Sequence, residues 1–233
     1  MYNKTSVLNY NLAVYGATVN NSVVGNVAGD LVYQISHKFT DHYCFNSTAQ
    51  SNPIWTSEAS LFAIWIGIND AQVSYLDPSP YKIVPFVVRS YFILLHDLYT
   101  CGARNILVIN VPPISRTPYM LSLRPWQRKI NQKFVDALNH EIEAMAVDWR
   151  KSHSDAFLEV YDVWSFMTMI LDRPRSYGFM DNRCSGERCI WWDDYHPSSA
   201  FHRLLAANIQ VKLSHDYGET AVKYNLECIR SET

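Results

Sequence analysis

Two short apolar segments constrain the fold of this chain more than any other feature of its sequence. Residues 60–68 read Ser-Leu-Phe-Ala-Ile-Trp-Ile-Gly-Ile, and residues 105–111 read Asn-Ile-Leu-Val-Ile-Asn-Val. Both are continuous and rich in β-branched or aromatic residues, which is typical of strands buried on both faces of a parallel sheet. Because such strands need helices to cover them, the two segments predict an α/β protein.

Segments with helical spacing alternate with the predicted strands. Residues 7–16 predict a further strand that ends in a glycine turn, and residues 157–161 predict a fourth strand. The alternation predicts an α/β sandwich with a parallel sheet, and we expect a single domain over residues 1–233, because no linker or repeat interrupts it. Apolar residues recur at helical intervals in residues 27–39, 81–100, 125–145, 163–171 and 198–213.

Composition excludes some partners. The 233 residues carry a net charge of −2, which gives no electrostatic argument for binding nucleic acid or an anionic membrane. The longest apolar run, Leu61 to Ile68, is too short to span a bilayer. No signal peptide is visible after Met1, although glycosylation sequons begin at Asn3, Asn20 and Asn46. We therefore expect neither a nucleic-acid nor a membrane partner.

The five cysteines predict one local crosslink. Cys184 and Cys189 are closely spaced with a glycine between them, which suits a disulfide loop. Zinc is the alternative, but no second close cysteine pair or nearby histidine pair supports it. The pairing of Cys44, Cys101 and Cys228 stays open, and the odd count leaves one free thiol or a partner elsewhere.

A carboxylate stands three residues before a histidine in Trp-Trp-Asp-Asp-Tyr-His-Pro, residues 191–197. A histidine is the natural general base at neutral pH, and a carboxylate orients its ring in a nucleophilic triad. His196 and Asp193 therefore make up two thirds of such a triad. Asp194 could replace Asp193, and pairs of this kind are also common as surface or capping residues. The two tryptophans could pack the core or contact a substrate.

Two further residues are expected at the carboxyl edge of the sheet, where open parallel sheets bind ligands. Gly16 ends the first predicted strand and can offer a backbone N–H, while Asn69 follows the second and can offer a side-chain amide. Two such donors can form an oxyanion hole for an acyl intermediate. Taken alone, Gly16 is equally explained as a turn, and Asn69 with Asp70 as a strand-end turn.

Together these segments resemble the SGNH/GDSL hydrolases, and more narrowly the fungal GDSL lipase/acylhydrolases of carbohydrate esterase family 16. The resemblance rests on Asn-Leu-Ala-Val-Tyr-Gly-Ala-Thr at residues 11–18, on residues 62–70, on Asn-Val-Pro-Pro at residues 110–113, and on residues 191–197. These segments match the family's second, third and fifth conserved blocks, in order, over nearly the whole chain.

The resemblance implies a three-layer α/β/α sandwich with a parallel, flavodoxin-like sheet. It implies a secreted, monomeric serine ester hydrolase that acts on carbohydrate or small acetyl esters without a metal or cofactor. In this family pattern Gly16 and Asn69 match the oxyanion donors, His196 the general base, and Asp193 the carboxylate. A lipase for long-chain esters would need an apolar lid, which the sequence does not show.

The sequence departs from the family at the nucleophile. The family's serine lies in a Gly-Asp-Ser block after its first strand, and this chain has no Gly-Asp-Ser. The nearest match, Gly29-Asp30-Leu31, falls in a predicted helix after the second block. The family's first strand lies in the middle of its sheet, so this chain is either a truncated esterase or folds differently, and we favour truncation.

Without the serine we expect the chain alone to be inactive as an esterase. The alternative function is that of a non-catalytic carbohydrate-binding pseudoenzyme, which keeps the aromatic residues of the cleft. Decay of the other site residues would indicate that role. Gly16, Asn69, Asp193 and His196 are all present, which favours the esterase lineage.

Overall fold

A small parallel sheet forms the centre of the fold. The computed structural model of the chain describes residues 7–44, 55–76 and 79–216. Strands β1 (Leu61–Trp65), β2 (Asn105–Ile109) and β3 (Phe157–Tyr161) pair in the order β1-β2-β3. Both pairs are parallel. The predicted parallel sheet is therefore confirmed for residues 61–65, 105–109 and 157–161.

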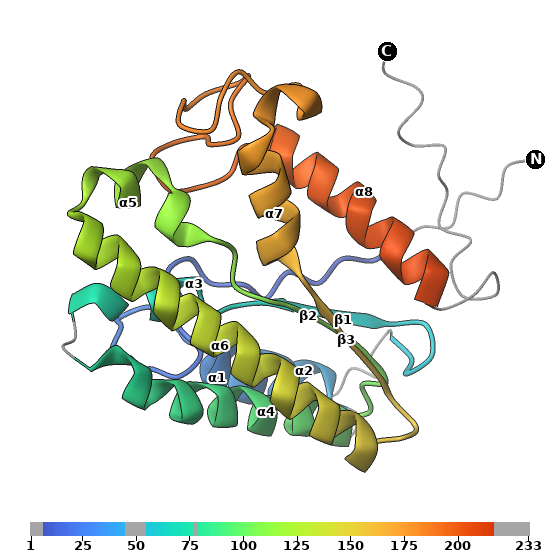
Figure 1. Cartoon of the computed structure of the whole chain (residues 1–233). Coiled ribbons are helices and arrows are strands. Elements are labelled where there is room, and N and C mark those ends of the chain that lie inside the picture. Colours follow the sequence, from blue (N-terminus) through green and yellow to red (C-terminus); the bar gives the residue numbers. More distant parts are fainter. Residues whose placement is uncertain (1–6, 45–54, 77–78, 217–233) are drawn as a thin grey trace, which may run out of the picture.

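Helices cover both faces of this sheet, which gives a three-layer α/β/α arrangement (Figure 1). Helices α1, α2, α4 and α6 lie on one face, and α7 and α8 lie on the other. The helices are α1 (Leu31–Tyr33), α2 (Thr40–Tyr43), α3 (Ile68–Gln72), α4 (Val84–Thr100), α5 (Pro118–Ser122), α6 (Pro125–Ser152), α7 (Val163–Asp172) and α8 (Ser199–Asp216). Shorter turns are η1 (Gln34–Phe39, a π-helix), η2 (Ser74–Leu76), η3 (Pro80–Ile83), η4 (Ile114–Arg116) and η5 (Pro174–Tyr177).

Strand β2 shows why the apolar pattern predicted its position. Successive side chains of a strand point to opposite faces, so a continuous apolar run suits a strand with a core on each side. Ile106 and Val108 lie in the core shared with α4 and α6. Leu107 and Ile109 lie in the core shared with α7 and α8.

The prediction that β1 is buried on both faces was wrong. Phe62 and Ile64 pack toward α4 and α6, but Leu61 is 46% exposed and Ala63 is also exposed on the opposite face. Strand β1 is the edge of the sheet, and the helices on that face bury only its last residue, Trp65, in part. An apolar run shows that a strand is suited to burial, but not whether a neighbour covers it.

The strand predicted over residues 7–16 was also wrong. Residues 7–14 have no regular secondary structure, although the turn at Tyr15 and Gly16 is present. Local hydrogen bonds replace a ladder here: the Asn11 side chain accepts the N–H of Ala13 at 3.0 Å, and the N–H of Ala17 donates to Val14 O at 3.3 Å. Asparagine side chains of this kind compete with strand pairing.

The helix predicted over residues 27–39 lies slightly later in the chain. Asp30 caps it by accepting the N–H of Tyr33 at 2.8 Å, so the helical stretch runs through α1, η1 and α2 to Tyr43. An aspartate at this position satisfies an otherwise unpaired N–H group of the first turn. Periodicity placed the helix correctly but did not mark its start.

Among residues 7–44, 55–76 and 79–216, one helix is long and apolar enough to cross a membrane, namely Pro80–Thr100 with a mean hydropathy of 1.2. In this fold α4 packs against the sheet and α6, with Val87, Val88 and Leu95 buried in the core. The remaining predicted helices, over residues 125–145, 163–171 and 198–213, correspond to α6, α7 and α8.

Two disulfides crosslink the part of the chain that the structure describes. Cys184 and Cys189 close the short loop before the histidine motif. Cys44 pairs with Cys101, 57 residues away, and so ties the end of the first helical stretch to the end of α4. Cys228 lies outside the described residues.

Candidate active site

The imidazole of His196 and the carboxylate of Asp193 form a close ionisable pair on the loop before α8. Nδ1 of His196 lies 2.8 Å from Oδ2 of Asp193. The other carboxylate oxygen accepts the backbone N–H groups of Tyr195 at 2.8 Å and His196 at 2.6 Å. Nε2 of His196 has no hydrogen-bond partner among the described residues. The ring is therefore held from one side with its other nitrogen open to accept a proton.

Hydrogen bonding sets the charge of Asp193. Partial burial favours the neutral acid, but the N–H groups of His196 and Tyr195 and the His196 ring outweigh it, so the pKa of Asp193 lies below its ordinary value. The carboxylate is therefore ionised at neutral pH and suited to stabilise an imidazolium. Asp194, the alternative from the sequence, makes a different contact: its carbonyl accepts the N–H of Tyr119 at 2.7 Å.

The segment that carries His196 is irregular and is held by several separate contacts. The hydroxyl of Ser185 donates to Asp193 O at 2.8 Å, and the N–H of Trp192 donates to His196 O at 2.8 Å. The hydroxyl of Ser198, at the entrance to α8, donates to Cys189 O at 2.8 Å. These bonds and the Cys184–Cys189 disulfide fix a stretch that has no helix or strand of its own.

Gly16 and Asn69, far apart in sequence, belong to one hydrogen-bonded unit. The Asn69 amide donates to Ala17 O at 2.8 Å, and the Asn26 amide donates to Gly16 O at 2.6 Å. Gly16 has a φ of 77°, a left-handed conformation that favours glycine. Within the described part of the chain the N–H of Gly16 has no partner. This N–H and the second amide hydrogen of Asn69 remain available as donors.

The position of Asn69 depends on a glycine turn between β1 and α3. Gly67 has a φ of 99°, and a Cβ added there would lie 2.8 Å from Cγ2 of Val111. Val111 is itself fixed by Asn139 of α6, which accepts its N–H and donates to its carbonyl, both at 2.8 Å. Only glycine permits this close approach of the two strand ends, which places α3 and Asn69 at the edge of the sheet.

Asp70, the neighbour of Asn69, is a buried carboxyl group beside the site. Both of its oxygens contact the N–H of Val19, at 3.2 and 3.1 Å. Burial raises its pKa to about 7, opposed by the Val19 hydrogen bond and assisted by the charge of Asp30. Asn69 contacts Ala17 and Asp70 contacts Val19, so the two side chains hold α3 against residues 17–19, which directly follow Gly16.

A small apolar cleft of about 50 Å³ lies beside His196. His196 lines it together with Ile68, which directly precedes Asn69. The Tyr15 ring, next to Gly16, lies 6.1 Å from the His196 ring between centroids. The cleft is lined by Trp65, Ile68, Pro112, Ile114, Thr117, Met167, Trp191, Tyr195, His196 and Pro197.

The structure separates the roles of the two tryptophans in the motif. Trp191 is buried, lines the cleft, and donates its ring N–H to Asn182 O at 3.0 Å. Trp192 is 63% exposed. The sequence indicated no role for Tyr15 or Asn26. Tyr15 is 181 positions from His196 and Asn26 is 10 positions from Gly16, and no spacing pattern links either pair. Asn26 was visible only as one of several asparagines in a turn-rich stretch.

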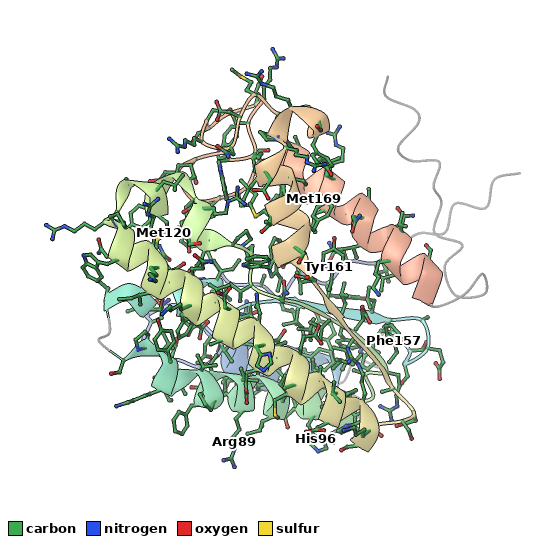
Figure 2. All side chains as sticks on the ribbon, viewed as in Figure 1. Arg89, His96, Met120, Phe157, Tyr161 and Met169 are labelled. Atoms are coloured by element: carbon green, nitrogen blue, oxygen red, sulfur yellow. A yellow bond between two sulfur atoms is a disulfide. The ribbon has the colours of Figure 1, made fainter. Side chains whose placement is uncertain are left out.

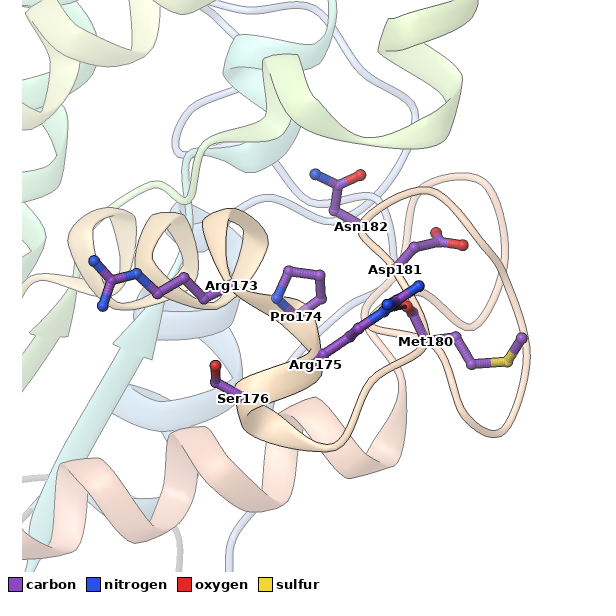
Figure 3. Close-up of a pocket in the computed structure, with 7 residues that line it drawn as sticks. All are labelled: Arg173, Pro174, Arg175, Ser176, Met180, Asp181 and Asn182. Atoms are coloured by element: carbon purple, nitrogen blue, oxygen red, sulfur yellow. Dashed lines mark hydrogen bonds between the residues drawn. The ribbon is translucent and has the colours of Figure 1, made fainter.

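A larger and more open hollow of about 410 Å³ lies at the end of α7 (Figure 3). Arg175 extends toward Asp181 and Met180 in this view, whereas Arg173 points away. The hollow shares no lining residue with the His196 cleft. Across the described residues, no group of three or more His, Cys, Asp or Glu side chains gathers to hold a metal ion.

A histidine–carboxylate pair and two N–H donors at the carboxyl edge of a three-layer parallel sheet place this chain among the α/β proteins with an SGNH-type hydrolase fold. Residues 2–209 match the GDSL-like Lipase/Acylhydrolase family. The chain therefore belongs to this family of carboxylic ester hydrolases.

Individual relatives agree with the family match. An acetylesterase of Thermothelomyces thermophilus is 31% identical over 213 residues, covering 88% of this chain and 69% of the relative. A GDSL esterase/lipase of Arabidopsis thaliana is 24% identical over 164 residues, 59% of this chain and 45% of the relative. An esterase of Hevea brasiliensis is 25% identical over 132 residues, 52% of this chain and 34% of the relative. The chain thus spans half or less of these plant relatives.

Proposed function

We propose that this chain carries the base and oxyanion-binding parts of a serine esterase site for short acyl esters. The observation that carries the proposal is the 2.8 Å contact between His196 and Asp193, with Nε2 of the imidazole open beside an apolar cleft. In an acyl-transfer reaction, Nε2 takes the proton of an attacking serine and later returns one to the leaving alcohol. The N–H groups of Gly16 and Asn69 stabilise the oxyanion.

The lining of the cleft supports an acyl ester as the substrate. Trp65, Ile68 and Met167 give the cleft an apolar wall beside His196. The most similar relative described above is named an acetylesterase, which supports acetyl esters of carbohydrates or small alcohols as the substrate class.

The sequence contains no Gly-Asp-Ser, and we propose that this chain lacks the family's nucleophile. We therefore expect the chain itself to hydrolyse 4-nitrophenyl acetate no faster than its His196→Ala variant. Loss of a triad nucleophile removes on the order of 10⁶-fold in kcat. Turnover by the chain that disappears in His196→Ala would contradict this part of the proposal.

A grafted nucleophile tests the remaining roles directly. The segment of a family member that carries its Gly-Asp-Ser block is fused ahead of residue 1, and hydrolysis is measured again. We expect activity to appear, to fall about 10⁶-fold in His196→Ala, and to fall about 10⁴-fold in Asp193→Ala. Asp194→Ala is the matched control and should keep the activity. Equal losses in Asp193→Ala and Asp194→Ala would overturn the assignment.

Exposed aromatic residues support a second candidate, carbohydrate binding without catalysis. Tyr15 is 86% exposed and lies against His196, while Trp192 is 63% exposed and is bonded to the His196 carbonyl. Aromatic rings of this kind present an apolar face to a ligand at low entropic cost. Calorimetric titration with acetylated xylo-oligosaccharides tests it: binding lost in Trp192→Ala supports the candidate, and no heat of binding to the chain contradicts it.

We also propose that the protein functions in an oxidising, extracellular compartment. Two disulfides within one chain support this location, because they rarely persist in a reducing cytosol. Mass spectrometry of the protein from its native source should find both pairs oxidised, and free Cys44 and Cys101 thiols would contradict the proposal.

A further inference from the structure

Two histidines meet at the C-terminal ends of α4 and α6, on different elements from the esterase site. Nδ1 of His96 lies 3.1 Å from Nε2 of His153. His96 is exposed just before the last turn of α4, and His153 is the C-cap residue of α6. Figure 2 shows His96 at the edge of the molecule beside the end of α6. The pair therefore links two helices at a surface open to solvent.

The His153 ring is fixed so that one nitrogen lone pair faces His96. Its Nδ1 lies 2.8 Å from the carbonyl oxygen of Trp149. A carbonyl oxygen only accepts, so the proton is on Nδ1 and Nε2 of the neutral ring carries the lone pair. The ring also stacks on Trp149 at 4.1 Å and meets the edge of Tyr99 at 4.5 Å. Histidines that bind metals are oriented in this way, with the second ring N–H bonded to a carbonyl.

We propose that His96 and His153 bind a divalent transition-metal ion such as Zn²⁺ through Nδ1 and Nε2, with water completing the coordination. Two imidazole nitrogens at about 2.0–2.1 Å from a tetrahedral zinc lie roughly 3.3 Å apart, close to the 3.1 Å between these atoms. In the metal-free pair His96 donates its Nδ1 proton to His153. When the ion binds, that proton moves to Nε2 of His96, and both facing nitrogens give lone pairs to the metal.

The surrounding charges favour a cation at this place. The C-terminal end of each helix carries a partial negative charge of roughly half an elementary charge, and α4 and α6 end together here. Neighbouring charged side chains are paired within 3.0 Å of one another, Arg104 with Asp155 and Lys151 with Asp148. Imidazole ligands suit Zn²⁺, Cu²⁺ and Ni²⁺, whereas Mg²⁺ prefers oxygen. Since the described residues supply only this pair, binding is expected to be reversible and to stabilise the contact between α4 and α6.

Thermal unfolding of the whole chain with the metal alone tests the proposal. We expect 1 mM Zn²⁺ in a non-chelating buffer to raise the Tm by roughly 2–4 °C, as a ligand of the folded state does above its Kd. Mg²⁺ should have no effect. His96→Ala should lose the zinc shift, with only a small fall in its metal-free Tm, because its hydrogen bond to His153 is exposed to solvent. His153→Gln is the second variant, since it retains a planar polar group against Trp149.

Two control variants decide where the ion binds. His37→Ala removes another surface histidine, and His196→Ala removes the one beside Asp193; both should keep the zinc shift. The proposal is wrong if the zinc-induced rise in Tm is absent in the wild-type chain, persists in His96→Ala, or disappears in His196→Ala. As an independent readout, the electron paramagnetic resonance spectrum of bound Cu²⁺ should show two equivalent imidazole nitrogens, reduced to one or none in His96→Ala.

Discussion

The side-chain amide of Asn69 donates a 2.8 Å hydrogen bond to the carbonyl oxygen of Ala17, the residue that follows Gly16. The two oxyanion donors inferred from the sequence are therefore coupled: whatever moves the start of α3 also moves the turn at Gly16. Only one amide hydrogen of Asn69 remains for a ligand. The second donor, the N–H of Gly16, is oriented by the same unit.

Replacing Asn69 should weaken the fold in a graded way. Asn69→Ala removes one hydrogen bond and is expected to cost about 1 kcal/mol of unfolding free energy. Asn69→Asp should cost more, because it places a carboxylate oxygen against the Ala17 carbonyl and leaves both without a donor. Urea denaturation of the two variants measures the difference. The coupling would be disproved if Asn69→Asp were as stable as the wild-type protein.

Gly67 should tolerate no side chain. Its φ of 99° is strained for any residue with a Cβ, and the added atom would lie 2.8 Å from Val111. We expect Gly67→Ala to lower the unfolding free energy by roughly 1–3 kcal/mol from backbone strain alone, with a further loss from the clash. Gly25→Ala is the matched control, because its Cβ would meet no atom within 4 Å. Equal stability of the two variants in a denaturation experiment would show that the contact is not restrictive.

The fold could be predicted where burial alone determines it. Strand β2 and helix α6 followed their apolar patterns, because each is covered by the elements that the pattern requires. Strand β1 has the same pattern, yet Leu61 is exposed, because the residues of a strand do not show whether it lies at the edge of the sheet. The strand predicted at residues 7–14 is absent for a related reason. A strand needs a partner strand to pair with, and the Asn11 side chain instead accepts a hydrogen bond from the nearby backbone.

The candidate site could be predicted where its residues are close in sequence or at strand ends. Asp193 and His196 are three residues apart, and their contact follows from that spacing. The hydrogen bond between Asn26 and Gly16, and the approach of Tyr15 to His196, depend on how loops fold over one another. No local pattern contains that information, so these contacts required the structure.

Asp70 should make stability depend on pH. Its pKa is about 7 in the folded protein because it is buried, against an ordinary value near 3.9 in the unfolded chain. Between these values the unfolded chain releases the proton and the folded protein keeps it. The contribution of Asp70 to stability is therefore fully present below about pH 4 and is lost as the pH rises to 7, by roughly 4 kcal/mol in all.

Comparison with Asp70→Asn isolates this effect. The asparagine can still accept the Val19 N–H but does not ionise, so its stability relative to wild type should rise steadily from pH 4 to pH 7 and then level off. Asp148→Asn, an exposed position, should follow the wild-type curve. Urea midpoints at a series of pH values give the measurement. Parallel curves for Asp70→Asn and wild type would mean that the carboxyl group is not buried in the folded protein.

Asp193 should hold the whole histidine segment and not only the ring. Its carboxylate accepts the N–H groups of Tyr195 and His196 and contacts the imidazole, so Asp193→Ala releases three bonds at once. We expect hydrogen–deuterium exchange to accelerate by at least tenfold at residues 195 and 196, because both amides lose the carboxylate that accepts their hydrogen bonds. Asp194→Ala leaves these bonds in place and should not change exchange at either amide. Since hydrogen bonding lowers the pKa of Asp193, protection in the wild-type protein should persist as the pH falls through the ordinary range for aspartate, and be lost only below it. Exchange at residues 195 and 196 that stays unchanged in Asp193→Ala would show that the segment is held by its other contacts, and Asp193 would then orient His196 alone.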